Sequence, residues 1–273
     1  MDIANSHKAH PWHGIDLGEN VPEEVRAFIE IVPTDTVKYE VDKASGYLSL
    51  DRPQKFSNIV PSLYGFLPRT YCASHMAELT NQALARYDVE GDGDPLDICV
   101  LTEKDVTHGD IIVRARPIGG LRLLDHDQAD DKIIAVLKND AVYGHLTDID
   151  ELPKDIIRRL IHYFTTYKDI PGENSQRMKF ISIYGAEVAK DVILRSMQDY
   201  QELIAAKQLT VRERSLFGAF FASGIDIGAR TVDGSCILFY INSLRSRRNE
   251  NADQYSYAEN SFQRYCLNLN SAV

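Results

Sequence analysis

The sequence has no closely spaced cysteine pair of the kind that zinc sites and redox motifs use. Its four cysteines are far apart among 273 residues, at Cys72, Cys99, Cys236 and Cys266. A disulfide framework is therefore not expected, and a reducing compartment is indicated. No apolar run approaches the roughly 18 to 20 residues that a membrane span needs, and the first residues are polar, unlike a signal peptide. These absences favour a cytoplasmic protein that does not contact a membrane.

Several common phosphate-binding and catalytic motifs are also absent. The sequence contains no GxxxxGK[ST] or GxGxxG loop, no HExxH metal motif and no GxSxG nucleophile motif. The net charge of −10 argues against nucleic acid as the partner, because a phosphate backbone binds basic surfaces. An anionic substrate of this acidic chain would need cations between itself and the protein.

The order of apolar patterns predicts an α+β protein. Short alternating segments with turn signals between them run from Val25 to about residue 137 and favour a β-barrel or meander. Helical spacing follows at 153–169 and 186–207, so two helices are expected to pack on the β-rich body. The predicted apolar faces of these helices are Ile156, Leu160, Ile161 and Phe164, and then Val188, Val192, Ile193 and Met197.

Composition suggests three parts, which are an arm at 1–20, a main domain at 21–207 and a C-terminal extension at 208–273. Residues 70–88 are interpreted as an inserted loop with room for a short helix. No lysine follows Lys207, although seven arginines do, and this shift sets the second boundary. The extension has apolar segments broken by glycine, which is consistent with a hairpin of unknown role.

The arm contains three histidines at helical spacing, His7, His10 and His13. This spacing could hold a metal ion on a helix. Pro11 and Gly14 make a helix unfavourable there, so a loose segment is the preferred interpretation.

Three carboxylates are crowded into EGDGDPLD, residues 90–97. Asp92, Asp94 and Asp97 lie so close that each raises the pKa of the next. One explanation is a solvated acidic turn, since Gly-Asp and Asp-Pro dipeptides are common in turns. The other is a site for a hard divalent cation. An EF-hand calcium loop does not fit, because Leu96 occupies its fifth position.

A second acidic segment, DHDQADDK at 125–132, joins two predicted strands. Its charged residues are Asp125, Asp127, Asp130, Asp131 and Lys132. By itself it would be a solvated hairpin loop. If the two acidic segments converge at the ends of strands in one β body, they offer five or more oxygen ligands, which suits several magnesium ions.

Basic and tyrosine side chains could balance this acid. Lys38 and Glu40 are two residues apart on a predicted strand and would project from the same face, as they would on an ordinary solvent face. Other candidates near the ends of strands and helices are Arg52, Tyr64, Tyr167 and Lys168. Cations and hydroxyls beside clustered carboxylates are what a metal-bridged phosphate requires.

A series of short segments occurs along the chain in an order that is characteristic of one family. They are IEI around Glu30, VKYEVDKASG at 37–46, DR ending at Arg52, PSLYGF around Tyr64, DGDPLD at 92–97, RPIGGLRLLD at 116–125 and HYFTTYKD at 162–169. Over roughly residues 21–200 the chain resembles the soluble family I inorganic pyrophosphatases, whose signature D-x-D-P-x-D it matches in full. The resemblance implies a five-stranded, OB-like barrel with flanking helices. It also implies hydrolysis of pyrophosphate with Mg²⁺, for which Mn²⁺ or Zn²⁺ are possible substitutes.

The resemblance also implies roles for the site residues. Asp92, Asp97 and Asp130 would hold a first metal ion, Asp97 would touch a second, and water between the two would be the nucleophile. Asp94 would accept the proton of that water. Asp125 and Asp130 would hold a metal ion that arrives with the substrate, and Glu40 and Glu30 would lie on a further metal or in the outer shell. The implied phosphate contacts are Lys38, Arg52, Tyr64, Lys132, Tyr167 and Lys168.

The chain departs from the family pattern in places. Val60 stands where many members have tyrosine, and His126 follows Asp125 where bacterial members often have an acid. The 70–88 insertion and the extension have no counterpart in compact bacterial members, which are commonly hexamers, whereas longer eukaryotic members are dimers. A homo-oligomer is expected, and its order is left open. Two other functions stay under consideration, a phosphohydrolase of nucleotides or polyphosphate and a catalytically weak member that binds partners through its tail.

Overall fold

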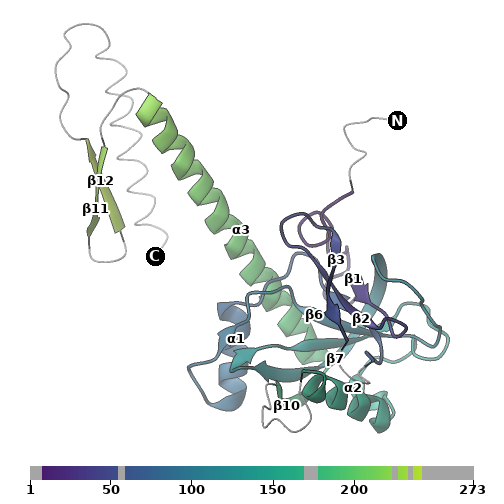
Figure 1. The fold of residues 1–273 in the computed structure, drawn as a ribbon. Helices are drawn as coiled ribbons and strands as arrows, with labels where there is room; N and C mark the ends of the chain where they lie inside the picture. The colour runs from purple at the N-terminus through teal and green to yellow at the C-terminus, as the bar shows by residue number, and fades with distance from the viewer. Residues whose placement is uncertain (1–7, 55–58, 169–177, 223–226, 233–235, 242–273) are drawn as a thin grey trace, which may run out of the picture. The chain divides into compact units, whose positions relative to one another are not determined.

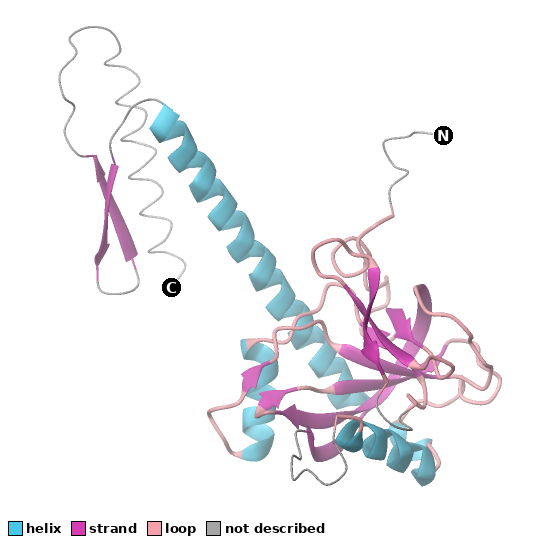
Figure 2. Ribbon diagram, in the orientation of Figure 1, coloured by secondary structure: helices cyan, strands magenta, loops and turns pink. Residues whose placement is uncertain are grey.

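The computed structural model describes residues 8–54, 59–168, 178–222, 227–232 and 236–241 (Figure 1). Side chains are described up to residue 208. The chain divides into two compact units, Met1–Lys207 and Gln208–Val273. Helices and strands alternate irregularly along the first unit, as Figure 2 shows. Among the described residues, no helix is both long and apolar enough to cross a membrane.

Five strands of the first unit form a closed ring. Each is hydrogen-bonded to the next in the order β1–β4–β6–β9–β7, and β7 pairs again with β1. Only the β6–β9 pair is parallel within this ring. The strands are β1 (Val25–Ile31), β4 (Leu63–Phe66), β6 (Asp97–Leu101), β7 (Ile111–Asp125) and β9 (Lys132–Leu137). The ring confirms the α+β class and the five-stranded architecture expected from the sequence.

The interior of the ring is filled by branched apolar side chains, as a small barrel requires. Ile29, Ile98 and Ile133 have no exposed surface, and Leu63 is 1% exposed. The strand β7 has 15 residues, so it can pair with β1 along its first part and with β10 (Met178–Gly185) along its second. The burial of apolar side chains inside the ring fixes the register of the strands and therefore the positions of the residues at their ends.

Besides β10, four other strands of the described part of the first unit lie outside the ring. The strands β2 (Val37–Val41) and β3 (Leu48–Pro53) form a separate two-stranded sheet, although the sequence analysis placed both in the continuous β body. Their side chains are mostly half-buried or exposed, so they are an antiparallel flap rather than part of the core. The strands β5 (Glu90–Gly91) and β8 (Gln128–Ala129) pair with each other beside β7.

Both helices begin close to the predicted positions, but the second continues past its predicted end at residue 207 to residue 222, and not every residue predicted to be buried is buried. The helix α2 (Lys154–Thr166) follows a short 3-10 turn, η2 (Ile149–Glu151), and buries Ile157, Leu160, Tyr163 and Phe164. The predicted Ile156 and Ile161 are only partly buried at the margin of this face. In α3 (Ala186–Ala222), Val192 and Ile193 are buried as predicted, whereas Val188 is 41% exposed because Ala189 takes its place in the core.

The 70–88 insertion contains an 11-residue helix, α1 (Ser74–Leu84). The segment before β1 is not loose where it is described, because Trp12 and Leu17 are buried. His13 also contacts the hydroxyl of Tyr200 at 2.8 Å, whereas His7 lies outside the described residues. In the second unit, β11 (Ile227–Val232) and β12 (Cys236–Ile241) form the antiparallel hairpin that the sequence suggested.

Candidate active site

One cavity of about 250 Å³ gathers nearly all of the residues predicted for the site. It lies where β2, β4, β6 and the ends of β7 and β9 meet, and it also reaches the end of α2. Every predicted site residue except Arg52 lines it. These residues are Glu30, Lys38, Glu40, Tyr64, Asp92, Asp94, Asp97, Asp125, Asp130, Lys132, Tyr167 and Lys168.

Strand pairing brings the two acidic segments together. Asp97 begins β6, Lys132 begins β9, and the two are register partners in the parallel β6–β9 pair. Asp130 is two residues before Lys132, so it lies at the same end of the ring. Asp92 lies in the turn before β6, where Gly93 has a φ of +75°, a conformation that favours glycine. The turn is therefore encoded locally, and its meeting with Asp130 depends on the barrel.

Lys132 is the centre of the acidic cluster. Its side chain is 2% exposed, and its ammonium group contacts the carboxylates of Asp97 and Asp130. Tyr64 donates a hydrogen bond of 2.5 Å to the same carboxylate of Asp97. Burial works against the charge of Lys132, but Asp130 and Asp97 raise its pKa well above the usual value. One buried ammonium thus contacts two of the clustered carboxylates and balances the charge of only one of them.

The remaining negative charge suits a divalent cation. Burial, followed by repulsion from Asp130, raises the pKa of Asp92 to about 8. Burial also raises the pKa of Asp97, although Lys132 opposes the effect. Carboxylates held this close give up their protons when a cation binds between them. The donors are carboxylate oxygens, which are the ligands that Mg²⁺ and similar hard ions prefer.

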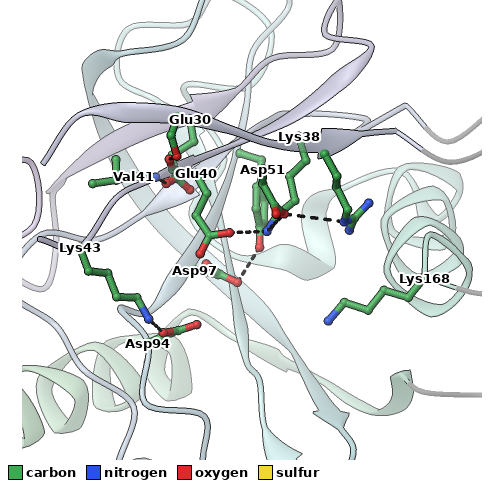
Figure 3. Close-up of polar contacts among 12 residues, drawn as sticks. Glu30, Lys38, Glu40, Val41, Lys43, Asp51, Asp94, Asp97 and Lys168 are labelled. Atoms are coloured by element: carbon green, nitrogen blue, oxygen red, sulfur yellow. Dashed lines mark hydrogen bonds and ion pairs between the residues drawn. The ribbon is translucent and has the colours of Figure 1, made fainter. Parts of the chain in front are cut away.

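Basic side chains from the flap and from just beyond the end of α2 also line the cavity. Lys38 donates to Glu40 at 2.7 Å and lies 3.1 Å from Asp51, as Figure 3 shows. Lys168 donates to Asp125 at 2.5 Å. Burial of Asp125 would raise its pKa, but the hydrogen bond and the charge of Lys168 lower it. Basic and acidic side chains are therefore paired with one another around the cavity.

Lys43 is a site residue that the sequence analysis missed. It lines the cavity and its ammonium group pairs with Asp94 (Figure 3). Lys43 comes after β2 in a turn closed by the hydrogen bond from Gly46 N–H to the carbonyl of Asp42. The alternation of apolar and polar residues that marks β2 stops at Val41. It therefore could not predict where the side chain of Lys43 points. Trp12 also lines the cavity, and nothing in its sequence context indicated this.

Arg52 and the two departures from the family pattern, Val60 and His126, lie away from the cavity lining. Arg52 is the register partner of Lys38, and its Nη1 atom is buried without a hydrogen-bond partner among the described residues. Val60 is fully buried in the core beside Ile31 and Cys99, so its side chain fills apolar space. His126 lies in a tight turn with a φ of +50° and contacts Asp125 at 2.8 Å through Nδ1.

The chain is similar to known proteins over the part that builds this cavity. The family model described as "Inorganic pyrophosphatase" matches residues 27–201, more than half of the chain. The chain belongs to the inorganic pyrophosphatase family. It is 50% identical over 199 residues to the inorganic pyrophosphatase of Chlamydia trachomatis serovar L2, covering 71% of this chain and 95% of that relative. It is 35% identical over 192 residues to the soluble inorganic pyrophosphatase of Oryza sativa, covering 70% and 79%.

Solved structures of inorganic pyrophosphatases share the fold. The enzyme from Thermus thermophilus aligns with a TM-score of 0.59 and 26% identity, covering 71% of this chain and 99% of that one. The enzyme from Helicobacter pylori aligns with a TM-score of 0.57 and 30% identity, covering 68% and 98%. The residues matched by the inorganic pyrophosphatase family model contain every predicted site residue. The second unit, Gln208–Val273, lies beyond the matched residues.

Proposed function

We propose that this cavity hydrolyses inorganic pyrophosphate to two orthophosphates with Mg²⁺, for which Mn²⁺ or Zn²⁺ can substitute. The supporting observation is the meeting of Asp92, Asp97 and Asp130 with the buried Lys132 in one cavity that further lysines also line. Such a cluster favours divalent cations, and these in turn attract a polyanionic phosphate. Membership of a metal-dependent enzyme family is consistent with this assignment.

The carboxylates are the proposed metal ligands. They are Asp92, Asp97, Asp125, Asp130 and Glu40. Divalent ions bound there supply charge neutralisation and lower the pKa of water. Glu30 is the proposed outer-shell group, because it is 7% exposed and accepts a 2.7 Å hydrogen bond from Val41 N–H.

Asp94 is the proposed general base. Its backbone N–H donates to Asp92 Oδ1 at 3.0 Å, so its main chain helps to hold a ligand while its half-exposed carboxylate points into the cavity. A base must lie within about 3 Å of the proton it takes, and Asp94 is two residues from one ligand and three from another. Lys43 pairs with this carboxylate and keeps it beside the ligands.

The phosphate groups are expected to bind the basic and hydroxyl side chains of the site. The contributing residues are Lys38, Arg52, Tyr64, Lys132, Tyr167 and Lys168. The lysines that line the cavity already pair with carboxylates, and phosphate oxygens are equivalent acceptors. Arg52 is the register partner of Lys38. Its Nη1 atom has no hydrogen-bond partner among the described residues and is suited to an anionic oxygen. In phosphoryl transfer the protein mainly positions groups and neutralises charge, as this arrangement can do.

Release of phosphate from pyrophosphate by the purified full-length protein is the direct test. Magnesium is titrated, and ATP and tripolyphosphate are run in parallel. Turnover of pyrophosphate alone supports the proposal. Turnover of ATP or tripolyphosphate but not of pyrophosphate would show that the substrate is a different phosphate compound. Magnesium binding without any turnover would support a binding role through the tail. The homo-oligomer and the cytoplasmic location are predictions from the sequence, and light scattering and cell fractionation test them.

A further inference from the structure

The segment that precedes α1 makes alternating backbone contacts to two different parts of the first unit. The N–H groups of Tyr71 and Ala73 point to α3, where they bond to the Ser196 carbonyl and the Asp199 carboxylate, both at 2.9 Å. Cys72 lies between them, and its backbone N–H and carbonyl groups point to the opposite side. This alternation is that of an extended chain, so the segment connects α3 with whatever Cys72 contacts.

Cys72 contacts the turn that carries the acidic signature. Its N–H donates to the carbonyl of Asp94 at 2.9 Å, and its carbonyl accepts from the N–H of Gly93 at 3.0 Å. The fit is close, because a Cβ atom on Gly91 would lie 2.3 Å from the Cys72 carbonyl oxygen. The backbone that presents Asp92 and Asp94 is therefore held against Cys72.

Asp199 fixes the other side of this segment. Its carboxylate is 2% exposed and accepts hydrogen bonds from the N–H groups of Ala73, His75 and Met76 at 2.9, 3.0 and 3.1 Å. Residue 73, at the N-cap of α1, is an alanine that has no capping side chain. A carboxylate at a helix N-terminus satisfies the free N–H groups and interacts favourably with the helix dipole. Asp199 thus caps α1 from a different helix.

We propose that Asp199 is a positioning residue for the metal-binding turn. By capping α1 it holds Ala73 in place, and the neighbouring Cys72 then holds Gly93 and Asp94. The 70–88 insertion and α3 would in this way orient Asp92 for the cation and Asp94 for the reaction. This inference rests on the proposed function and gives the insertion a role in it. Groups that orient metal ligands change metal affinity or activity by about 10- to 100-fold when they are removed.

The test uses full-length Asp199→Ala, with Asp199→Asn as the conservative variant and Glu202→Gln as the matched control. Asparagine keeps one oxygen for these N–H groups and is a good N-cap, but its amide nitrogen cannot accept the hydrogen bonds that the other carboxylate oxygen takes. Glu202 is on the same helix, and its carboxylate contacts the side chain of His75 at 2.8 Å rather than a backbone N–H group of α1, so Glu202→Gln leaves the hydrogen bonds of the cap in place. Magnesium affinity is measured without substrate by calorimetry and by fluorescence of Trp12, the single tryptophan of the chain, which lines the cavity.

We expect Asp199→Ala to weaken magnesium binding about tenfold and to speed hydrogen exchange of the Cys72 and Gly93 amides. Asp199→Asn keeps one accepting oxygen and should recover part of the affinity, and Glu202→Gln should match the wild type. A lower melting temperature of Asp199→Ala with unchanged magnesium affinity would overturn the inference, because Asp199 would then be a structural anchor only.

A second variant covers the case in which Asp199→Ala does not fold. Gly91→Ala pushes on the Cys72 carbonyl from the opposite side and should also weaken magnesium binding, with α1 still capped. Unchanged magnesium affinity in a folded Gly91→Ala protein would overturn the inference. Failure of the wild-type protein to bind magnesium and to hydrolyse pyrophosphate would instead overturn the proposed function itself.

Discussion

Glu30 provides a quantitative prediction about stability and pH. It is 7% exposed in β1 and accepts a hydrogen bond from Val41 N–H. Burial, opposed by this hydrogen bond and strengthened by the charges of Asp97 and Glu40, raises its pKa from 4.5 to about 8. In the metal-free protein at neutral pH, the folded state therefore holds a proton on Glu30 that the unfolded state has released.

The sign of the effect follows from this difference in bound protons. The folded state binds more protons between about pH 4.5 and pH 8, so the free energy of unfolding falls as the pH rises through this window. The stabilisation is complete below pH 4.5 and is lost once the pH passes about 8. One pKa unit corresponds to about 1.4 kcal/mol, so the upper limit is about 5 kcal/mol. Relaxation around the charge reduces it, and we expect about 2 to 4 kcal/mol.

Glu30→Gln removes the ionisable group and keeps an oxygen for Val41 N–H. Chemical unfolding is measured in the presence of a chelator at pH 5, 6, 7, 8 and 9. We expect the variant to gain about 2 to 4 kcal/mol relative to the wild type between the lowest and the highest pH. Glu19→Gln is the control, because Glu19 is an exposed glutamate, and it should run parallel to the wild type.

Parallel curves for Glu30→Gln and the wild type would refute this reasoning. Such a result would mean that the Glu30 carboxylate ionises in the folded protein as readily as in the unfolded chain. The buried position of Glu30 in the structure would then not be the environment of its ionised carboxylate. Asp92 and Asp131, whose burial raises their pKa values to about 8 and about 6, contribute equally to both curves and cancel in the difference.

The remaining predictions concern the reaction and the assembly. Asp94→Asn should fold and bind magnesium but lose turnover by roughly 100-fold or more, the usual scale for a general base; steady-state kinetics beside the exposed control Asp105→Asn checks this, and near-normal turnover would remove the role given to Asp94. Asp97→Asn should instead weaken magnesium binding, as calorimetry would show, and unchanged affinity would exclude Asp97 as a ligand. Deletion of the residues after Lys207 should leave turnover intact, and light scattering then tells whether the tail is needed for assembly. A loss of turnover with unchanged assembly would contradict the prediction that residues up to Lys207 are sufficient for catalysis.

Local patterns predicted much of the fold because they depend on neighbouring residues. Strand periodicity located β1 and β9, and the spacing of Leu160 and Phe164 located α2. The same patterns could not exclude β2 and β3 from the ring, since alternation looks alike in a barrel strand and in a flap. They also placed Val188 in the core, because helical spacing does not show which of two adjacent apolar residues faces the sheet.

The sequence by itself determined the chemistry of the site. The glycines and the proline of residues 90–97 set the turn locally, and Asp92, Asp94 and Asp97 are crowded there whatever the rest of the chain does. Local sequence fixes backbone dihedral angles and the direction of side chains along one element. It therefore identified the residue types and the resemblance to a family.

Only the tertiary structure decided which of these residues meet. The parallel β6–β9 register places Lys132 between Asp97 and Asp130, and the turn after β2 aims Lys43 at Asp94. Asp199 reaches the insertion from more than 100 residues away in the chain. These contacts join segments that are distant in sequence, and their geometry is set by the shared burial of many side chains in one core rather than by any local pattern.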